Sequence, residues 1–345
     1  CYKKLNMSKK NSSVILKNKF ESFKDLSQIF LKFEKKIIKL KSRKFLVAVS
    51  GGPDSLALTA LTMAYGIKTN TKFFYVLINH NIRKDSKKEA IKVKSLLKKH
   101  NVNLKIISIK QKISKNVQNE ARIHRYKLLS DYCKKKNITT ILTAHNLEDQ
   151  VETFFIRLSR GSGLTGLSSM RFLSHLSDKT LLARPLLDVK KRYLISISKK
   201  TFGKYFKDPS NTSKRYLRSR IRTLQKPLLK SGINYDSIFK SITNLASSKS
   251  VLDNYYNQLS RDIIKKYKNE VCINFKNLND LSDEIKIRII NDSIRHIKKN
   301  YYNPRSRKVE NLIYKLKQKN FTKTTLGGCV FLKKNDKIWL KKEKK

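Results

Sequence analysis

The stretch VAVSGGPDSLAL, residues 47–58, connects two apolar runs through a loop of small and polar residues. FLVAVS (45–50) is rich in residues typical of a buried strand, and the apolar spacing from Ser55 onward indicates a helix. Glycines between a strand and a helix let the backbone approach a phosphate, and the amide groups of the new helix point at the anion. The stretch therefore predicts a phosphate-binding loop, with a plain tight turn as the alternative.

The polar residues of this loop indicate which kind of phosphate site it forms. A Walker A loop is excluded, because that motif requires a lysine before its final hydroxyl residue and none is present. Asp54 would repel a phosphate unless a cation lay between them, so we expect Asp54 to hold Mg²⁺; the alternative is that it caps the following helix. The residues expected at the phosphate are Ser50, Gly51, Gly52, Pro53, Asp54 and Ser55.

The sequence on either side of the loop predicts the fold. Three further runs have the character of buried parallel strands, at residues 72–80, 104–109 and 139–145, and helical patterns separate them. Strands and helices that alternate in this order predict an α/β fold with a doubly wound parallel sheet and helices on both faces. An additional amphipathic helix is expected at residues 21–41.

The pattern changes in the last third of the chain, which predicts a second domain. Residues 230–318 predict helices only, and residues 324–342 predict a β-hairpin that turns near Lys334, Asn335 and Asp336. We therefore expect a second, mainly helical domain that ends in a β-hairpin. The expected limits are 1–42 for a basic segment and helix, 43–222 for the phosphate-binding domain and 223–345 for the helical domain, with a boundary at 222–230.

The composition indicates the partner and the compartment. The chain has 79 Lys and Arg against 25 Asp and Glu, a formal net charge of +54, which predicts attraction to a polyanion such as nucleic acid; lysine bias from an AT-rich genome is the alternative. Cys1, Cys133, Cys272 and Cys329 form no CxxC pair, so we expect a reduced compartment without disulfides or a cysteine metal site. No apolar run approaches the ~20 residues of a membrane span, so we expect a soluble protein that is not secreted.

Five spaced motifs carry a resemblance to a known family. SGGPDS (50–55) resembles the SGGxDS signature of the PP-loop ATP pyrophosphatases, whose fold is adenine nucleotide alpha hydrolase-like. The resemblance covers residues 43–222, and five motifs in order are far more specific than one. The other motifs are similar to those of the tRNA(Ile)-lysidine synthase family: NHNIRKDSKKEA (79–90), NEARIHRYKLL (119–129), TAHNLEDQVETFFIRLSRGSGLTGL (143–167), and RPLL (184–187) with KDPSNTSKRYLRSRIR (207–222).

The resemblance implies an ATP-dependent carbon–nitrogen ligase that modifies tRNA. Such an enzyme adenylates the wobble cytidine of isoleucine tRNA with a CAU anticodon, joins free L-lysine to form lysidine, and releases AMP and pyrophosphate, so that decoding changes from AUG to AUA. ATP is then a substrate and Mg²⁺ the cofactor. Two alternatives stay open: a PP-loop tRNA thiolation enzyme, against which the missing CxxC pairs argue, and a non-catalytic RNA-binding module. Bacterial cytoplasm and plastid stroma both fit, and so does a homodimer.

Acidic residues follow the predicted strand TTILTAH. Asp149 and Glu152 are three residues apart at the start of a helix, so they share a face near the carboxyl end of the sheet. The resemblance assigns both to catalysis and lysine binding, and a favourable charge at a helix N-terminus is the alternative. The resemblance also places His145 at ATP, and a histidine that is only packed in the core is the alternative. Asn146 and Glu148 depart from the His and Asp that the family often has at these positions.

Basic residues cluster in two of the motifs. Arg122 and Arg125 share a helix face; the resemblance implies a catalytic contact with ATP phosphates for Arg122 and a tRNA contact for Arg125, and a solvated basic face is the alternative. The last motif places a tyrosine among basic residues, which suits phosphate contacts and base stacking; a basic surface loop is the alternative. Its residues expected to bind tRNA are Lys214, Arg215, Tyr216, Arg218, Arg220 and Arg222.

Overall fold

The chain forms two compact units, residues 1–246 and 247–345. The structure, a computed structural model, describes residues 24–82, 85–109, 117–177, 179–206, 217–298, 304, 306–318 and 320–343. The division between the two units comes after residue 246, which is later in the chain than the expected boundary at 222–230. The reason is that the short helices after residue 216 pack within the first unit. The expected domain limits of 1–42, 43–222 and 223–345 stay predictions.

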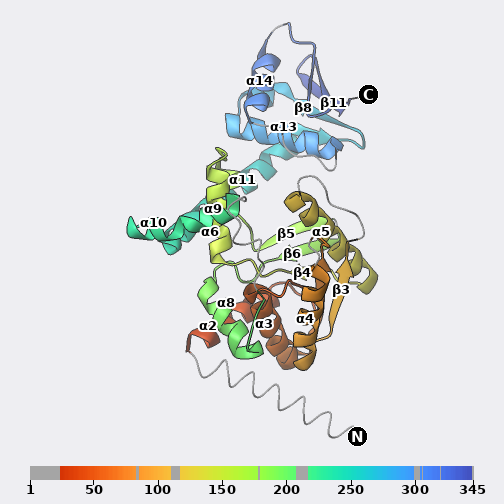
Figure 1. The fold of residues 1–345 in the computed structure, drawn as a ribbon. Coiled ribbons are helices and arrows are strands. Elements are labelled where there is room, and N and C mark those ends of the chain that lie inside the picture. Colours follow the sequence, from red (N-terminus) through yellow and green to blue (C-terminus); the bar gives the residue numbers. More distant parts are fainter. Residues whose placement is uncertain are drawn as a thin grey trace. The chain divides into compact units, whose positions relative to one another are not determined.

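The first unit is built around a mixed sheet, here called the N-terminal sheet (Figure 1). The four strands expected from the sequence are present, and β5 and β6 complete the sheet. Neighbouring strands are parallel except β5, which runs antiparallel to β6. Among the described residues the sheet has the order β3-β2-β1-β4-β6-β5, with β1 Lys44–Val49, β2 Lys72–Asn79, β3 Leu104–Ser108, β4 Thr140–Leu142, β5 Leu173–Ser177 and β6 Thr180–Ala183.

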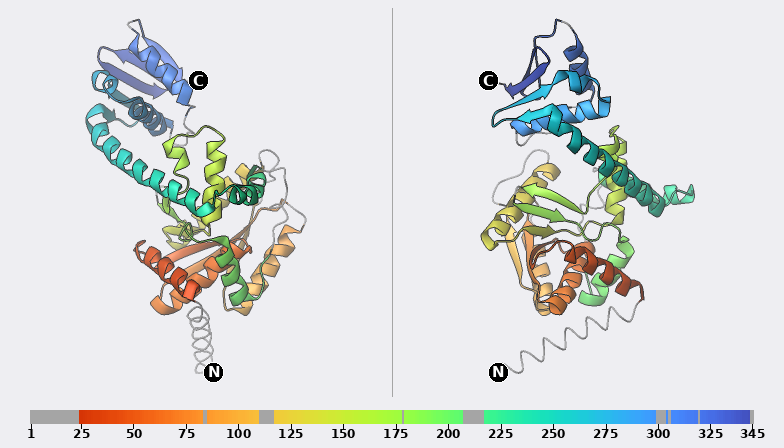
Figure 2. Two further views of the ribbon diagram at one scale, coloured as in Figure 1. Left: turned by 90° about the vertical axis from the view of Figure 1, so that its left-hand side faces the viewer. Right: turned by 180° about the vertical axis from the view of Figure 1, so that it is seen from behind.

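Helices cover both faces of this sheet, as the doubly wound prediction requires (Figure 2). Strand β1 is buried on both sides: Phe45 and Val47 belong to one apolar cluster and Leu46 to another. The first cluster includes residues of α2, α3, α4 and α8, and the second includes residues of α5. The helices of the unit are α2 Lys24–Ile38, α3 Pro53–Thr69, α4 Ser86–Lys99, α5 Val117–Lys136, α6 Leu147–Leu158, α7 Leu164–Leu167, α8 Lys191–Phe202, α9 Leu217–Thr223 and α10 Gln225–Lys230.

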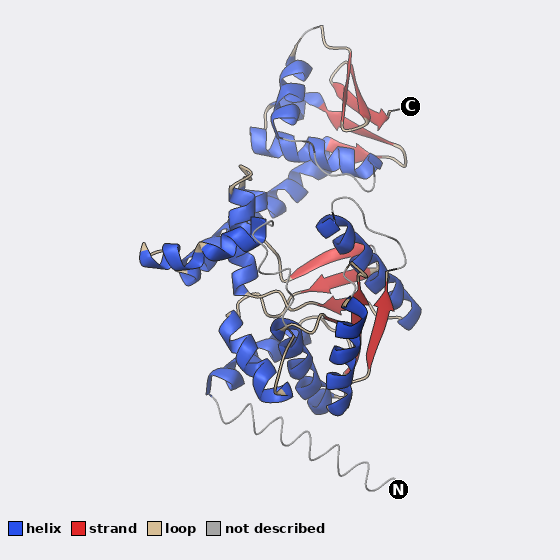
Figure 3. Ribbon diagram, in the orientation of Figure 1, coloured by secondary structure: helices blue, strands red, loops and turns tan. Residues whose placement is uncertain are grey.

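The second unit combines helices with an antiparallel sheet, here called the C-terminal sheet (Figure 3). The predicted hairpin is present, and Asn335 turns it with a φ of 52°. The expectation of helices only over residues 230–318 is wrong at β7 and β8, because β8 acquires its partner from β11, far along the chain. In the described residues the strand order is β7-β8-β11-β10-β9, with β7 Ile264–Lys266, β8 Glu270–Asn274, β9 Lys323–Leu326, β10 Cys329–Lys334 and β11 Lys337–Lys342.

Helix α11 (Tyr235–Ile263) contributes residues to both units. In the second unit, α12 (Phe275–Asn279), α13 (Asp283–Lys298) and α14 (Ser306–Lys317) pack on the C-terminal sheet and bury an apolar core against it. Across the described residues, no helix combines the length and the apolar character needed to cross a membrane.

Candidate active site

The loop between β1 and α3 requires glycine at its first turn. Gly51 has a φ of +84°, in the left-handed region that favours glycine. A Cβ atom at this position would lie 2.5 Å from Cγ2 of Val93 on α4, so a side chain has no room. The amide of Phe206 donates to the carbonyl oxygen of Gly51 at 3.0 Å and holds the loop from the other side. The loop conformation is therefore fixed by its neighbours before any ligand binds.

The Ser55 hydroxyl organises the loop from within. Its oxygen accepts from the amides of Ser50 and Gly51 at 3.1 Å each and from the Ser50 hydroxyl at 3.1 Å, and it donates to the carbonyl of Gly52 at 3.0 Å. Ser55 is buried, and its hydroxyl is committed to the loop itself. The first-turn amides of α3, which have no partner within the helix, are the donors that this arrangement offers to an anion.

Asp54 carries a buried carboxylate oxygen that lacks a donor. Its Oδ1 atom has no hydrogen-bond partner among the described residues. Burial raises the pKa of Asp54 to about 6; the negative charges of Asp149 and Glu148 act in the same direction, while Lys191 and a hydrogen bond from Asn146 oppose them. The N-cap residue of α3 is Gly52 and no side chain caps the helix, so the alternative role of Asp54 as a cap is wrong.

The environment of Asp54 fits a magnesium ion. A buried carboxylate oxygen without a donor is stabilised by a cation, and Mg²⁺ binds in proteins through one or two carboxylates plus phosphate oxygens and water. Over the described ranges no group of three or more His, Cys, Asp or Glu side chains is placed to hold a metal. Asp54 would therefore hold the ion with at most one further side chain of these types, and a bound phosphate and water would supply the other ligands.

Asn146 and Glu148, which follow β4, hold helices α6 and α8 in place. Asn146, 1% exposed, is the N-cap of α6: its Oδ1 accepts from the Asp149 amide at 2.9 Å, and Asp149 Oδ2 accepts from the Asn146 amide at 3.1 Å. Glu148 Oε2 accepts from the amide of Lys191 at 2.9 Å, at the start of α8. The two departures from the family pattern, Asn146 and Glu148, thus have helix-capping roles in this chain.

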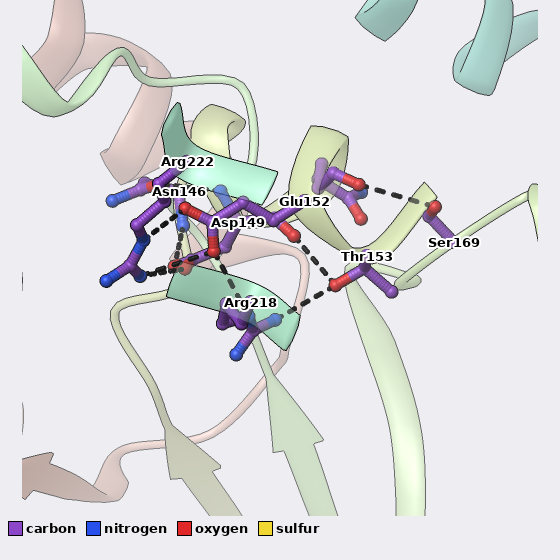
Figure 4. Close-up of polar contacts among 8 residues, drawn as sticks. Asn146, Asp149, Glu152, Thr153, Ser169, Arg218 and Arg222 are labelled. Atoms are coloured by element: carbon purple, nitrogen blue, oxygen red, sulfur yellow. Dashed lines mark hydrogen bonds and ion pairs between the residues drawn. The ribbon is translucent and has the colours of Figure 1, made fainter. Parts of the chain in front are cut away.

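The acids expected to bind lysine lie against arginines expected to bind tRNA (Figure 4). Arg222 donates from Nε to Oε1 of Glu152 at 2.6 Å and from Nη2 to Oε2 at 3.2 Å. Arg218 Nε lies 3.1 Å from Oε2 of Glu152, and its Nη2 donates to the Thr153 hydroxyl at 3.1 Å. Arg222 Nη2 also lies 3.9 Å from Oδ1 of Asp149. We call Asp149, Glu152, Arg218 and Arg222 the acid–arginine cluster.

The acid–arginine cluster joins α6 to α9, which the sequence did not predict. Glu152 is 3% exposed, and burial raises its pKa although the hydrogen bond from Arg222 opposes this shift. A buried glutamate is stable only when paired, so a partner was to be expected, but its identity depends on how α9 packs on α6. Arg222 is 70 residues from Glu152 in the chain, which no local pattern reports.

His145, at the end of β4, is a neutral imidazole in a basic environment. Its Nδ1 lies 3.0 Å from the hydroxyl of Thr143. Burial lowers the pKa of His145 to about 3; Asp149 opposes this, and the positive charges of Arg184, Arg125 and Arg122 add to it. The structure therefore brings His145 into the electrostatic reach of both Arg122 and Arg125 of α5.

Sequence reasoning missed two further arginines, Arg184, which acts on His145, and Arg157, which acts on Arg184. Arg184 is 7% exposed; its Nη1 donates to the carbonyl of Arg171 and the hydroxyl of Ser174, and its Nε is buried without a hydrogen-bond partner among the described residues. Burial and the charge of Arg122 lower the pKa values of Arg157 and Arg184. Such uncompensated cations favour an anion. The RPLL motif, which contains Arg184, was the available signal.

The remaining predicted residues have different surroundings. The guanidinium carbons of Arg122 and Arg125 each lie 5.0 Å from the ring centroid of Tyr126. Arg122 is exposed and Arg125 half-buried, and Arg220 is exposed on α9. Three residues expected to bind tRNA, Lys214, Arg215 and Tyr216, lie outside the described residues.

Comparisons with known proteins identify the family of this chain. The family model described as PP-loop domain matches residues 25–229. The tRNA(Ile)-lysidine synthase of Wolbachia pipientis wMel is 32% identical over 302 residues, which cover 86% of this chain and 70% of the relative. The enzyme of the same name from Rickettsia bellii (strain OSU 85-389) is 31% identical over 315 residues, which cover 87% and 70%.

Among solved structures, the U34-tRNA thiolase NcsA from Methanococcus maripaludis is similar, with a TM-score of 0.52 and 19% identity over 64% of this chain and 78% of that chain. This likeness concerns the fold, which is the PP-loop fold that the motifs predicted. The sequence relatives show the family as well as the fold, because they match most of the length of this chain. The loop between β1 and α3 and the acid–arginine cluster lie within the span that the family model matches. The chain belongs to the tRNA(Ile)-lysidine synthase family of PP-loop proteins.

Proposed function

We propose that this chain is an ATP-using ligase that joins L-lysine to the wobble cytidine of an isoleucine tRNA with a CAU anticodon. Family membership supports the ligase class and its substrates ATP, lysine and tRNA. The observation that carries the proposal is the buried, unpartnered Oδ1 of Asp54 beside the phosphate loop and the acid–arginine cluster. In a plain structural loop, a buried carboxylate oxygen would normally have a donor, and Oδ1 of Asp54 has none among the described residues.

The reaction needs a leaving group at the cytosine carbonyl. Adenylation of that oxygen by ATP, with release of pyrophosphate, provides one, and the lysine amine then displaces AMP. The loop and the first-turn amides of α3 would bind the phosphates, and Asp54 would hold Mg²⁺. Mg²⁺, when bound, offsets phosphate charge. Arg122 lies among charges that favour an anion, which suits a catalytic contact with the ATP phosphates.

The acid–arginine cluster suits the charges of free lysine. An amino acid presents a carboxylate and ammonium groups, and the cluster contains guanidinium groups of Arg218 and Arg222 beside the carboxylates of Asp149 and Glu152. The Oδ2 atom of Asp149 caps α6, while its Oδ1 is 3.9 Å from Arg222, so this oxygen is only weakly engaged. We propose that Asp149 and Glu152 bind lysine and keep it at the phosphate loop.

The charge of the chain supports tRNA as the third substrate. The net charge of +54 favours a polyanion, and exposed Arg220 on α9 with half-buried Arg125 on α5 suits backbone phosphates. Joining lysine to the cytidine of the CAU anticodon would change decoding from AUG to AUA. In this proposal, Lys214, Arg215 and Tyr216 contribute to the same tRNA contact.

The cysteines disfavour tRNA thiolation as the activity. Cys133, Cys272 and Cys329 lie on α5, β8 and β10, and all three are buried. Burial raises the pKa of each thiol, that of Cys133 to about 12, so none of the three is prepared to act as a thiolate. A ligase that uses lysine needs no such group.

Incorporation of labelled lysine tests the proposal. The protein is incubated with ATP, Mg²⁺, labelled lysine and either isoleucine tRNA with a CAU anticodon or methionine tRNA. We expect ATP-dependent label in the isoleucine tRNA alone, with the rate reduced about 100-fold or more in Asp54→Asn, since several kcal/mol of charge stabilisation is lost. Asp85→Asn, at the exposed N-cap of α4, is the matched control. ATP turnover with tRNA but without lysine transfer would overturn the proposal.

A further inference from the structure

The two faces of the C-terminal sheet have different characters. Strand residues alternate between faces, and Ile273, Phe331 and Ile338 point to the buried core that α13 and α14 cover. Figure 3 shows these helices beside the strands. The strand residues that alternate with these core residues form the other face. The pairing register places one residue from each strand side by side in a row across that face. The row runs Lys265, Cys272, Trp339, Leu332 and Lys323, from β7 to β9.

Trp339, the middle residue of this row, forms an aromatic pair with Tyr267, which follows β7. Trp339 is half-buried at the centre of the sheet, and the ring of Tyr267 stacks on it with 6.2 Å between centroids and 20° between planes. Tyr267 is 46% exposed. Trp339 is the only tryptophan of the chain, and it lies on the face opposite the apolar core. Large aromatic side chains outside a core are typical of binding surfaces.

Lysines surround the aromatic pair. Lys265 and Lys323 end the row at its two sides, and Lys337 precedes Trp339 by two residues on the same face; all three are exposed. Lys265 and Lys337 are also close enough to Cys272, the neighbour of Trp339, to oppose the rise of its pKa that burial causes. Lys341 is paired with Glu270 at 2.8 Å and contributes less. We call Trp339, Tyr267, Lys265, Lys323 and Lys337 the Trp339 face.

We infer that the Trp339 face binds an unpaired segment of RNA, with a base on the aromatic pair and the lysines at its phosphates. Flat rings accept a base because every base has a π-face, and a basic rim follows the backbone. A duplex keeps its bases stacked internally, and an acidic peptide would use the lysines without the rings. The inference rests on the proposed function only for the identity of the RNA, which would be the tRNA substrate.

The single tryptophan makes the contact directly measurable. The full-length protein is titrated with a short oligouridylate, with the same strand in duplex with oligoadenylate, and with heparin, while tryptophan fluorescence and the anisotropy of the labelled ligand are recorded. We expect the single strand to quench fluorescence with the same midpoint as its binding. Heparin, which has charge but no bases, is expected to bind without quenching. Trp339→Ala should weaken binding of the single strand by about 5- to 150-fold.

Matched variants separate this contact from general charge and from folding. Tyr314→Ala changes an aromatic residue that is 69% exposed on α14, and Lys308→Gln/Lys315→Gln changes two exposed lysines of the same helix. We expect neither variant to alter quenching, whereas Lys265→Gln/Lys337→Gln leaves Trp339 in place, weakens binding and reduces its salt dependence.

The outcomes distinguish the two proposals. Three outcomes would overturn the inference about the Trp339 face even if lysine is incorporated into tRNA. They are binding of the oligouridylate without quenching, binding of the duplex as tight as that of the single strand, and a loss of binding in the α14 lysine variant as large as in Lys265→Gln/Lys337→Gln. Quenching by the single strand that requires a higher strand concentration in Lys265→Gln/Lys337→Gln would support the inference even if lysine incorporation fails.

Discussion

Replacing Gly51 by alanine tests how the phosphate loop depends on its neighbours. A non-glycine residue in the left-handed region costs roughly 1–2 kcal/mol, and an extra methyl group forced into a packed region costs roughly 1–3 kcal/mol. Both apply, because Gly51 has a φ of +84° and its Cβ would lie 2.5 Å from Cγ2 of Val93. We therefore expect Gly51→Ala to lower the free energy of unfolding by about 2–5 kcal/mol.

Two matched variants separate the backbone effect from the packing effect. Gly161 also has a positive φ, +65°, but a Cβ there meets nothing within 4 Å, so Gly161→Ala should show only the backbone cost of roughly 1–2 kcal/mol. Val93→Ala removes the methyl group that Gly51→Ala would meet. The double variant should then be more stable than the sum of the single effects predicts, by about 1–3 kcal/mol.

Urea unfolding and the affinity for a non-hydrolysable ATP analogue are the two measurements. A loop that moves to accommodate the methyl group displaces its amides. We therefore expect Gly51→Ala to lower the affinity for the ATP analogue by about 10- to 100-fold, and Gly161→Ala to leave this affinity unchanged. A stability loss equal to that of Gly161→Ala, together with no coupling to Val93→Ala, would refute the packing argument.

Two further substitutions test charges in the site. The pKa of His145 falls from 6.5 to about 3 on folding, so stability is full above pH 6.5 and is lost as the pH falls, by about 2 kcal/mol between pH 6.5 and about pH 5. His145→Gln should abolish this part of the pH dependence of urea unfolding, and an unchanged slope would show that His145 titrates normally. Arg222→Leu should cost about 2–4 kcal/mol of unfolding free energy, because it leaves Glu152 buried with one partner fewer; Arg222 is partly exposed, which moderates the loss. Unchanged unfolding with weaker tRNA binding would mean that Arg222 contacts RNA only.

Local patterns in the sequence predicted the features that depend on near neighbours. Strands β1, β2 and β3 follow from short apolar runs, and the tight loop between β1 and α3 follows from its glycines. The hairpin turn at Asn335 follows from turn-forming residues between alternating runs. In each case the physical cause, a periodic apolar face or a required backbone conformation, lies within a few residues.

The partners of buried charges could not be predicted in this way. Glu152 was assigned to lysine and Arg222 to tRNA, yet the two side chains form a two-point ion pair across α6 and α9. Asn146 and Glu148 looked like departures from a catalytic pattern, and they cap α6 and α8. Capping and pairing depend on which element packs nearby, and only the packed structure shows this.

The sequence by itself therefore determined the family, the glycine-containing loop between β1 and α3, and the parallel strands of the N-terminal sheet, because motifs and periodicity record the local requirements of a backbone. Tertiary structure decided that Asp54 keeps an oxygen without a donor, that Glu152 is paired with Arg222, and that strands β7 and β8 place Lys265 and Cys272 in register with Trp339. These features join residues that are distant in the chain. Their energies come from burial and pairing, which exist only after the elements have packed.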